Sequence, residues 1–399
     1  AAACAGFRFD PVLVGDALGI GRFPALRAFG TLERARHVVR AAGREFEFDS
    51  HQIRELLLDE LPEPLLEELH AALGDALEQR TGTATQDADA LDGALAHRLL
   101  EHFLTARRFE RARRYLLPAL QHLERGFLNE AHLSLARRAL DAPGFLTGTE
   151  RCAVLHRASQ RFEQLGLSDE ERALIEEALA VADETGDPYH RASARRLLAV
   201  RHAYDGNAAE SLRLHAESIR LAEDASDRVE LARCRGDHGL TLWNHGAPER
   251  ARDESLAAIE IARDCGAARP ECVATANLGN ILKWLGELEE AHQTTTRALE
   301  LIRRLGDRRG EGIVLGNLGV GAMDLGRPAE ALGHLDRSLE IARAVCDRSC
   351  EAFALFNLAD VWLTVGRTER GARHAEHAAL LFEQIGHAQG CERSRELLA

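Results

Sequence analysis

Three asparagines recur at intervals of forty residues in this 399-residue chain: Asn277, Asn317 and Asn357. A carboxamide side chain offers two N–H donors and a carbonyl acceptor. The backbone of an extended peptide presents N–H and C=O groups in alternation, so a row of such side chains on one surface could bind a peptide. The same asparagines could instead hydrogen-bond a neighbouring helix and fix the stacking of structural repeats, because buried amides need partners. The sequence leaves both roles open.

Two series of turn residues indicate which elements must position these side chains. Each series has the forty-residue period, and the second series lies halfway between the members of the first. Stretches with helical spacing of apolar residues separate the turns, which predicts a helix–turn–helix unit repeated six times after about residue 147. The first series is Gly166, Gly206, Gly246, Gly286, Gly326 and Gly366, and the second is Gly186, Ser226, Gly266, Gly306, Cys346 and Gly386.

The units also align in the helices between the turns. Asn277-Leu278-Gly279 matches Asn317-Leu318-Gly319 in the first helix, and Glu290-Ala291 matches Glu330-Ala331 in the second. This pattern resembles the tetratricopeptide repeat, over roughly residues 147–390. The common period of that repeat is about 34 residues, so each unit here is longer by about six residues, which is under two helical turns. The resemblance implies an all-α fold, a tetratricopeptide-repeat right-handed superhelix (α-solenoid).

The repeat pattern also predicts buried positions and helix boundaries. Each helix pair exposes an apolar face that only the next pair covers. Pro248 and Pro328 follow a turn glycine by two residues, where the first turn of the second helix tolerates a missing N–H. The residues expected between helices are Leu278, Leu282, Ala291, Ala298 and Leu299.

In tetratricopeptide superhelices the first helix of each unit lines the concave groove, and the resemblance carries that role to matching positions here. Trp243 and Trp284 are amphipathic anchors if they are exposed, and wedges in the core if they are not. The groove and peptide-binding candidates are Asn277, Asn280, Lys283, Trp284, Asn317, Asp324, Asn357, Asp360, Arg233, Asp237, Trp243, Asn244, Arg196 and Tyr204.

Residues 1–80 do not follow the forty-residue period. Helical spacing over 10–18 and 24–35 is followed by a predicted short β-hairpin, whose strands 37–40 and 45–48 flank a turn at Gly43. Two further helical stripes run on either side of Pro62 and Pro64. Helix, helix, hairpin, helix, helix is a winged-helix-like order.

The motifs in this segment, Ala2 to Asp10 and Phe46 to Glu55, resemble the winged helix that follows the ATPase core in bacterial signal-transduction ATPases with numerous domains (STAND proteins). Similar segments occur in multidomain serine/threonine kinases. In some relatives a histidine near the position of Ser50 senses a nucleotide phosphate, so Ser50 and His51 are the weak cofactor-binding candidates. The alternative is a packing element without a ligand.

Residues 81–90 are small and polar, which predicts a linker. Apolar stripes over 91–146 predict irregular helical repeats that adapt the winged-helix-like segment to the regular repeats at 147–399.

Several classes of function are disfavoured by composition and motif. The net charge of −14 argues against general nucleic-acid binding, and Glu67 and Glu68 make the second helix of the winged-helix-like segment a poor phosphate contact. No Walker loop and no catalytic constellation are present, so we expect no enzyme activity of this chain, no cofactor and no metal site.

Cys346 and Cys350, expected on one helix face, lack further ligands for a metal ion. We expect the four histidines His97, His102, His122 and His132 to lie on solvated helix faces.

The sequence therefore favours a protein-interaction and sensor region that binds a peptide or protein and regulates an NTPase or kinase core upstream of residue 1. The alternatives are a constitutive assembly scaffold and the ligand-sensing region of a transcriptional regulator. No apolar stretch is long enough for a membrane span, and cysteines without a pairing pattern fit a reducing cytoplasm.

Overall fold

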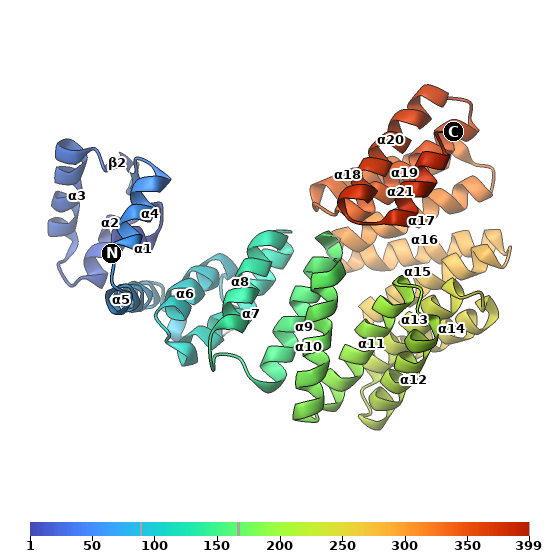
Figure 1. The fold of residues 1–399 in the computed structure, drawn as a ribbon, viewed down its shortest axis with the longest axis horizontal. Coiled ribbons are helices and arrows are strands. Elements are labelled where there is room, and N and C mark those ends of the chain that lie inside the picture. The colour runs from blue at the N-terminus through green and yellow to red at the C-terminus, as the bar shows by residue number, and fades with distance from the viewer. Residues whose placement is uncertain (88–89, 166–167, 399) are drawn as a thin grey trace. The chain divides into compact units, whose positions relative to one another are not determined.

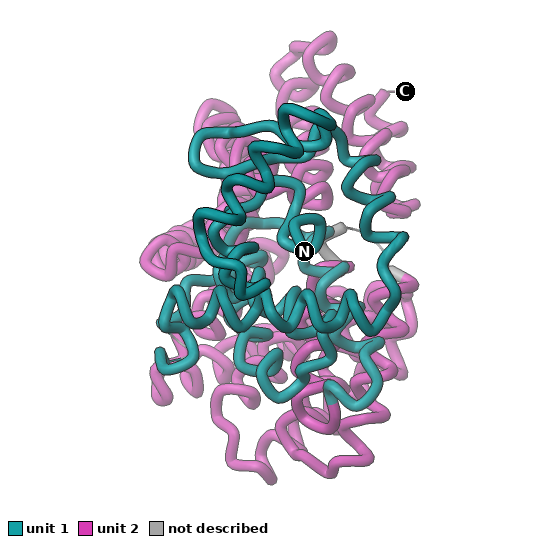
Figure 2. The backbone as a smooth tube through the Cα atoms, turned by 90° about the vertical axis from the view of Figure 1, so that its left-hand side faces the viewer, with its two compact units in different colours: residues 1–146 teal, residues 147–399 magenta. Residues whose placement is uncertain are grey.

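The structure, a computed structural model, describes residues 1–87, 90–165 and 168–398 (Figure 1). The chain forms two compact units, residues 1–146 and 147–399 (Figure 2). Gly166 of the first turn series lies outside the described residues, as do positions 88 and 89 of the expected linker.

The first unit begins with a small sheet among helices. The strands are antiparallel in the order β1-β3-β2, and Phe9, Phe29, Phe46 and Phe48 form the core around them. The predicted hairpin is present as β2 and β3, but its first strand begins two residues later than predicted because His37 caps α3. The strand β1, of two residues, is too short to show an alternating pattern in the sequence. The elements are α1 (Ala2–Ala5), β1 (Arg8–Phe9), α2 (Pro11–Ala17), α3 (Arg22–Arg36), β2 (Val39–Ala42), β3 (Glu45–Phe48), α4 (His51–Asp59) and α5 (Glu63–Thr81).

Three helices complete the first unit: α6 (Gly93–Thr105), α7 (Phe109–Arg125) and α8 (Asn129–Asp141). The buried Tyr115 hydroxyl on α7 donates a 2.6 Å hydrogen bond to Glu78 on α5. The expected linker contains a 3-10 turn, Thr83–Thr85, and Arg114 on α7 donates to the Thr83 carbonyl. The described part of this segment is therefore packed against α7.

The expectation that four histidines lie on solvated faces is wrong for His102 and His132. His102 on α6 is 5% exposed and His132 on α8 is fully buried. Neighbouring helices cover both side chains. The Arg and Glu residues that surround these histidines in the sequence therefore did not indicate that the histidines are exposed.

The described residues of the second unit form six helix pairs, each with a first helix A and a second helix B, followed by α21 (Ala388–Glu396). Pro248 and Pro328 are the first residues of their B helices, as predicted. The A helices are α9 (Gly148–Leu165), α11 (Pro188–Tyr204), α13 (Arg228–Asn244), α15 (Ala268–Trp284), α17 (Arg308–Asp324) and α19 (Arg348–Thr364). The B helices are α10 (Ser168–Thr185), α12 (Ala208–Asp224), α14 (Pro248–Asp264), α16 (Leu288–Leu305), α18 (Pro328–Ala344) and α20 (Thr368–Gln384).

The residues of the two turn series end the helices by taking a left-handed backbone conformation. The described turn glycines have positive φ, and at Gly246 a Schellman pattern closes α13, because Gly246 N–H donates to Trp243 O and Ala247 N–H donates to Leu242 O. Ser226 and Cys346 take the same left-handed conformation, with φ of 55° and 53°. Four of the turns that lead into A helices also carry a cap: the side chains of Asp187, Asp227, Asp307 and Asp347 accept a hydrogen bond from the N–H three residues later.

The predicted repeat core is confirmed. Leu278, Leu282, Ala291, Ala298 and Leu299 are between 0% and 8% exposed. Small residues let the paired helices approach closely: a Cβ added to Gly319 on α17 would lie 2.5 Å from the Leu335 Cγ and 3.3 Å from the Ala331 carbonyl oxygen on α18.

One expectation about the cysteines is wrong. Cys346 lies in the turn between α18 and α19, while Cys350 lies on α19, so the two do not share a helix face. All eight cysteines are free thiols. Among the described residues, no group of three or more metal-ligating side chains is placed to hold an ion, and no helix has both the length and the apolar character to cross a bilayer.

We predict that Cys346→Gly raises the melting temperature. The exposed Cys346 holds a left-handed conformation that costs an L-residue about 1–2 kcal/mol, whereas glycine adopts it freely at some cost in chain entropy, for a net gain of up to about 1 kcal/mol. The matched control is Gly326→Ala, which should lose about 1 kcal/mol because a Cβ there meets no atom and only the positive φ matters. A lower melting temperature for Cys346→Gly would contradict this account of the turns.

We also predict that Ala331→Leu destabilises the second unit. Ala331 is fully buried between α17 and α18, so added methyl groups must overpack the contact, at about 1–3 kcal/mol. Ala329→Leu on the exposed side of α18 makes the same change without a close neighbour and should melt like the parent. Equal melting temperatures for the two variants would show that the helix contact is misplaced.

Candidate functional site

The candidate site is the face formed by the A helices of the second unit, which we call the A-face. Each A helix from α9 to α19 contacts the A helix of the next repeat, and α9 also contacts α19. No two consecutive B helices have a comparable contact among the described residues. In a curved stack the inner elements approach one another more closely, so the A-face is the concave side of the solenoid.

The three asparagines occupy the A-face of α15, α17 and α19, and all three are partly exposed. The Asn277 Nδ2 atom is buried without a hydrogen-bond partner, and the side chains of Asn317 and Asn357 form no hydrogen bond to the described part of the chain. The asparagines therefore do not tie neighbouring helices together in this structure. The amides of Asn317 and Asn357 keep the capacity to bind another backbone, whereas the Asn277 Nδ2 atom is itself covered.

An apolar row, which the sequence reasoning missed, runs beside the asparagines. Val273, Ile313 and Phe353 precede the three asparagines by four residues, so each lies one helical turn away on the same side of its helix. These side chains are 40–43% exposed, and they recur at equivalent positions of three successive A helices. The forty-residue spacing of Val273, Ile313 and Phe353 was the signal available in the sequence.

The C-terminal ends of α15 and α17 add polar and aromatic groups. Trp284 is 60% exposed, which agrees with an anchor and not with a core wedge. The Lys283 ammonium lies 3.4 Å from the Asp324 carboxylate and links the two helices. Asn280 is half-buried and Asp360 is exposed, so both remain accessible on this part of the A-face.

The A-face of α11 and α13 is closed by its own charges. Arg196 donates to Glu230 at 2.8 Å and to Asp237 at 2.6 Å, and Arg233 lies 3.1 Å from Glu230. Glu230 is fully buried, and the Arg196 side chain is 13% exposed. The predicted groove residues Arg196 and Asp237 therefore bind each other across two repeats, and Arg233 joins them through Glu230.

Burial opposes the charge of Arg196, but Glu230 and Asp237 outweigh this effect and raise the pKa of the guanidinium. The neighbouring His156 on α9 has its pKa lowered to about 3 by burial and by the positive Arg196. The histidine is thus neutral near pH 7, and the ion network keeps fixed charges.

The remaining candidates on this half of the A-face differ in accessibility. Trp243 is half-buried and packs against a core cluster that contains Leu242 and Ile281, so it acts as a wedge. Asn244 is exposed at the end of α13. Tyr204 is 63% exposed, and the Arg201 guanidinium lies 5.5 Å from its ring centroid.

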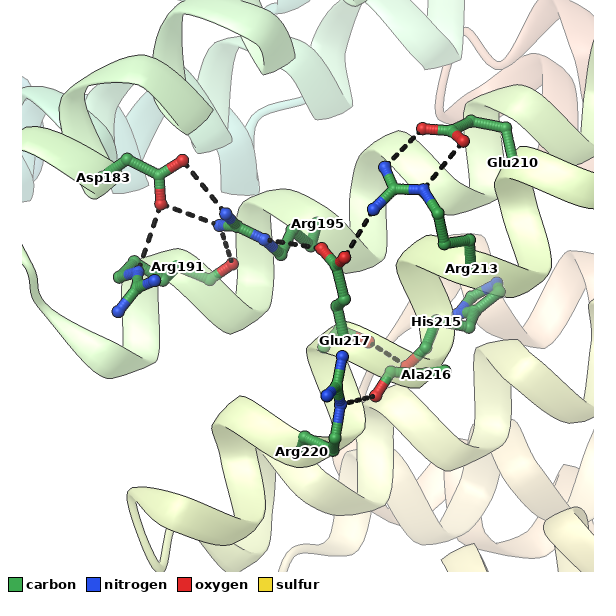
Figure 3. A network of polar contacts seen from close by, with 10 residues as sticks. Asp183, Arg191, Arg195, Glu210, Arg213, His215, Ala216, Glu217 and Arg220 are labelled. Carbon is green, nitrogen blue, oxygen red and sulfur yellow. Dashed lines mark hydrogen bonds and ion pairs between the residues drawn. The ribbon is translucent and has the colours of Figure 1, made fainter.

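A second ion network lies outside the A-face and joins three successive helices (Figure 3). Arg195 on α11 contacts Asp183 on α10 and Glu217 on α12, and Glu217 also pairs with Arg213. The exposed Arg213 side chain gives water ready access to its two ion pairs. This network links repeats without using the groove.

The two weak cofactor candidates have structural roles. The Ser50 Oγ atom accepts a 3.3 Å hydrogen bond from the Ile53 N–H and caps α4. The His51 ring stacks on Phe7 with 4.0 Å between ring centroids. Both contacts favour the packing interpretation of this segment over nucleotide contact.

The paired helices, left-handed turns and concave A-face define a tetratricopeptide-repeat solenoid. Residues 311–384 match the family model described as tetratricopeptide repeat. No curated protein sequence matches the chain at a significant level.

Three solved structures share the fold at low sequence identity. A STAND protein with a tetratricopeptide repeat sensor from Pyrococcus horikoshii has a TM-score of 0.53 and 13% identity; the match covers 96% of this chain and 59% of that one. A Rap protein complexed with Competence and Sporulation Factor has a TM-score of 0.59 and 11% identity, over 80% of this chain and 94% of that one. Aspartyl phosphate phosphatase F from Bacillus subtilis has a TM-score of 0.54 and 12% identity, over 83% and 87%.

We predict that Arg196→Met strongly destabilises the second unit. The substitution leaves the buried Glu230 and Asp237 carboxylates without their main cation, at a cost of about 3 kcal/mol. Urea denaturation followed by circular dichroism measures the change. Arg213→Met removes an arginine from exposed pairs and should shift the midpoint far less, because water screens those charges. Similar shifts for the two variants would show that the Arg196 network is not buried as described.

Proposed function

We propose that residues 147–399 form a sensor region that binds a peptide segment in extended conformation along the A-face of α15, α17 and α19. The observation that carries this proposal is the row of asparagine amides without partners, set beside the exposed apolar row. The amides would bind the peptide backbone, and Val273, Ile313 and Phe353 would contact its apolar side chains.

The charges on the A-face favour peptide binding at α15, α17 and α19 over binding at α11 and α13. Binding at α11 and α13 would have to break the Arg196–Glu230–Asp237 pairs and leave buried charges uncompensated, which is unfavourable. The asparagine and apolar rows on α15, α17 and α19 take part in no ion pair within the described residues, so binding along these rows separates no charges and removes apolar surface from water. The exposed Trp284 adds a large aromatic surface at one end of this stretch.

The regulatory part of the proposal concerns the parent protein. The chain spans 59% of the STAND protein, which has a tetratricopeptide repeat sensor, and the Rap protein is in complex with Competence and Sporulation Factor. By analogy, binding at the A-face would regulate an NTPase or kinase core upstream of residue 1. A peptide can do so only if it binds two states of the parent with different affinities. Free thiols at all eight cysteines suit a reducing cytoplasm as the location.

The test is peptide selection from a displayed random library on the full chain, followed by fluorescence anisotropy with a selected peptide. Asn317→Ala should weaken binding by about tenfold, because a hydrogen bond to a desolvated backbone contributes about 1–1.5 kcal/mol. Asn207→Ala makes the same change in an exposed turn off the A-face and should bind like the parent.

Trp284 gives an independent readout. Peptide binding should change the intrinsic fluorescence, and Trp284→Phe should remove most of that change because the exposed indole becomes covered. Selected peptides that bind Asn317→Ala and Asn207→Ala equally, with no change in Trp284 emission, would place the binding surface elsewhere.

A further inference from the structure

A cavity of about 420 Å³ lies in the first unit, away from the repeat region that carries the proposed peptide site. Residues of α1, α4, α5, α6 and α8 line it. Its walls carry an unusual set of side chains for an acidic chain: three arginines, three histidines and one glutamate, namely Arg54, Arg98, Arg138, His70, His97, His102 and Glu101.

The charges that line the cavity do not cancel. Arg138 forms an ion pair with Glu101 and also donates to the Thr105 hydroxyl at 3.1 Å. Arg54 donates its Nε–H to the Ala3 carbonyl at 2.9 Å, and Arg98 is exposed; within the described residues neither guanidinium has a carboxylate partner. Three arginines against one glutamate leave two positive charges at the cavity. Two uncompensated guanidinium groups are suited to bind an oxyanion.

The histidines supply neutral hydrogen-bonding groups. The Nδ1 atoms of His70 and His102 lie 3.1 Å apart, so one ring donates and the other accepts. The accepting ring must then carry its proton on Nε2, where it is a donor. Burial, with His70 and Arg98 as further causes, lowers the pKa of His102 to about 3, so this ring adds no positive charge at neutral pH.

We propose that this cavity binds the phosphate group of a small molecule. A phosphate monoester carries a charge of about −1.5 to −2 near pH 7, which matches the two positive charges of the uncompensated guanidinium groups. One carboxylate would neutralise only one of these two positive charges. The volume falls in the range of small-molecule sites, at about 300–1,000 Å³, so it accommodates an organic group beside the phosphate.

The test is isothermal titration calorimetry of the full chain with inorganic phosphate, phenyl phosphate and acetate, all at one ionic strength. We expect saturable one-site binding of a phosphate with a dissociation constant of about 1 mM or tighter, and much weaker binding of acetate. Tighter binding of phenyl phosphate than of inorganic phosphate would assign an organic phosphate as the ligand, and equal binding would assign the free ion.

Two variants locate the site. Arg98→Gln removes an uncompensated charge and should weaken phosphate binding by about tenfold or more. Ser134→Glu adds a carboxylate to an exposed position that lines the cavity and should have at least as large an effect. The control is Arg44→Gln, which changes the net charge of the chain by the same amount as Arg98→Gln. Because Arg44 lies in the hairpin turn, this variant should bind phosphate like the parent.

Thermal melts of each variant check that the fold is retained; both test positions are exposed, so we expect unchanged melting temperatures. The proposal is overturned if no phosphate binds saturably, if acetate binds as tightly as phosphate, or if Arg98→Gln and Ser134→Glu bind phosphate as the parent does.

Discussion

The left-handed residue that follows each helix from α10 to α20 is the constraint on which the structure of the repeat region depends. It recurs every twenty residues through the described turns from Gly186 to Gly386, and from Gly206 onward each of these turns has the Schellman hydrogen bonds. Because the turns are evenly spaced, equivalent residues of successive A helices face the same side. Rows such as Asn277, Asn317 and Asn357 exist only because this spacing is kept.

The same register divides the concave face by chemistry. On α11 and α13 the inward positions carry Arg196, Arg233, Glu230 and Asp237, which neutralise one another and hold two repeats together. On α15, α17 and α19 the corresponding surface carries amides and exposed apolar side chains. One half of the face thus stabilises the stack through buried charge pairs, while the other half is left with binding capacity. Among the described residues, three ion pairs join repeats on this half, Lys283–Asp324, Arg269–Asp307 and Arg309–Asp347, and each involves a residue near the end of an A helix. The asparagines and the apolar row between them take part in none of these pairs.

Most of the repeat fold could be predicted from the sequence because glycine marks the left-handed positions. Glycine does not mark the position where another residue takes the left-handed conformation. In the turns around α7, Arg107 and Phe127 have φ of 55° and 54°. The turns of the first unit therefore do not form a glycine series in the sequence. For the candidate site, the positions on the helices could be predicted, but the pairing of Arg196 with Glu230 and Asp237 could not. That pairing depends on which side chains meet across a repeat interface, which spacing alone does not determine. The burial of His102, covered by α5, likewise depends on a tertiary contact.

The central claim is that the open part of the concave face, and not its ion-paired part, binds a peptide backbone. The most direct measurement is a crystal structure of the chain with a peptide selected on it. We expect an extended peptide along α15, α17 and α19, with its N–H and C=O groups hydrogen-bonded to the amides of Asn317 and Asn357 and the Arg196–Glu230 pair intact. A peptide seated on α11 and α13 with that pair broken, or on the B helices, would contradict it.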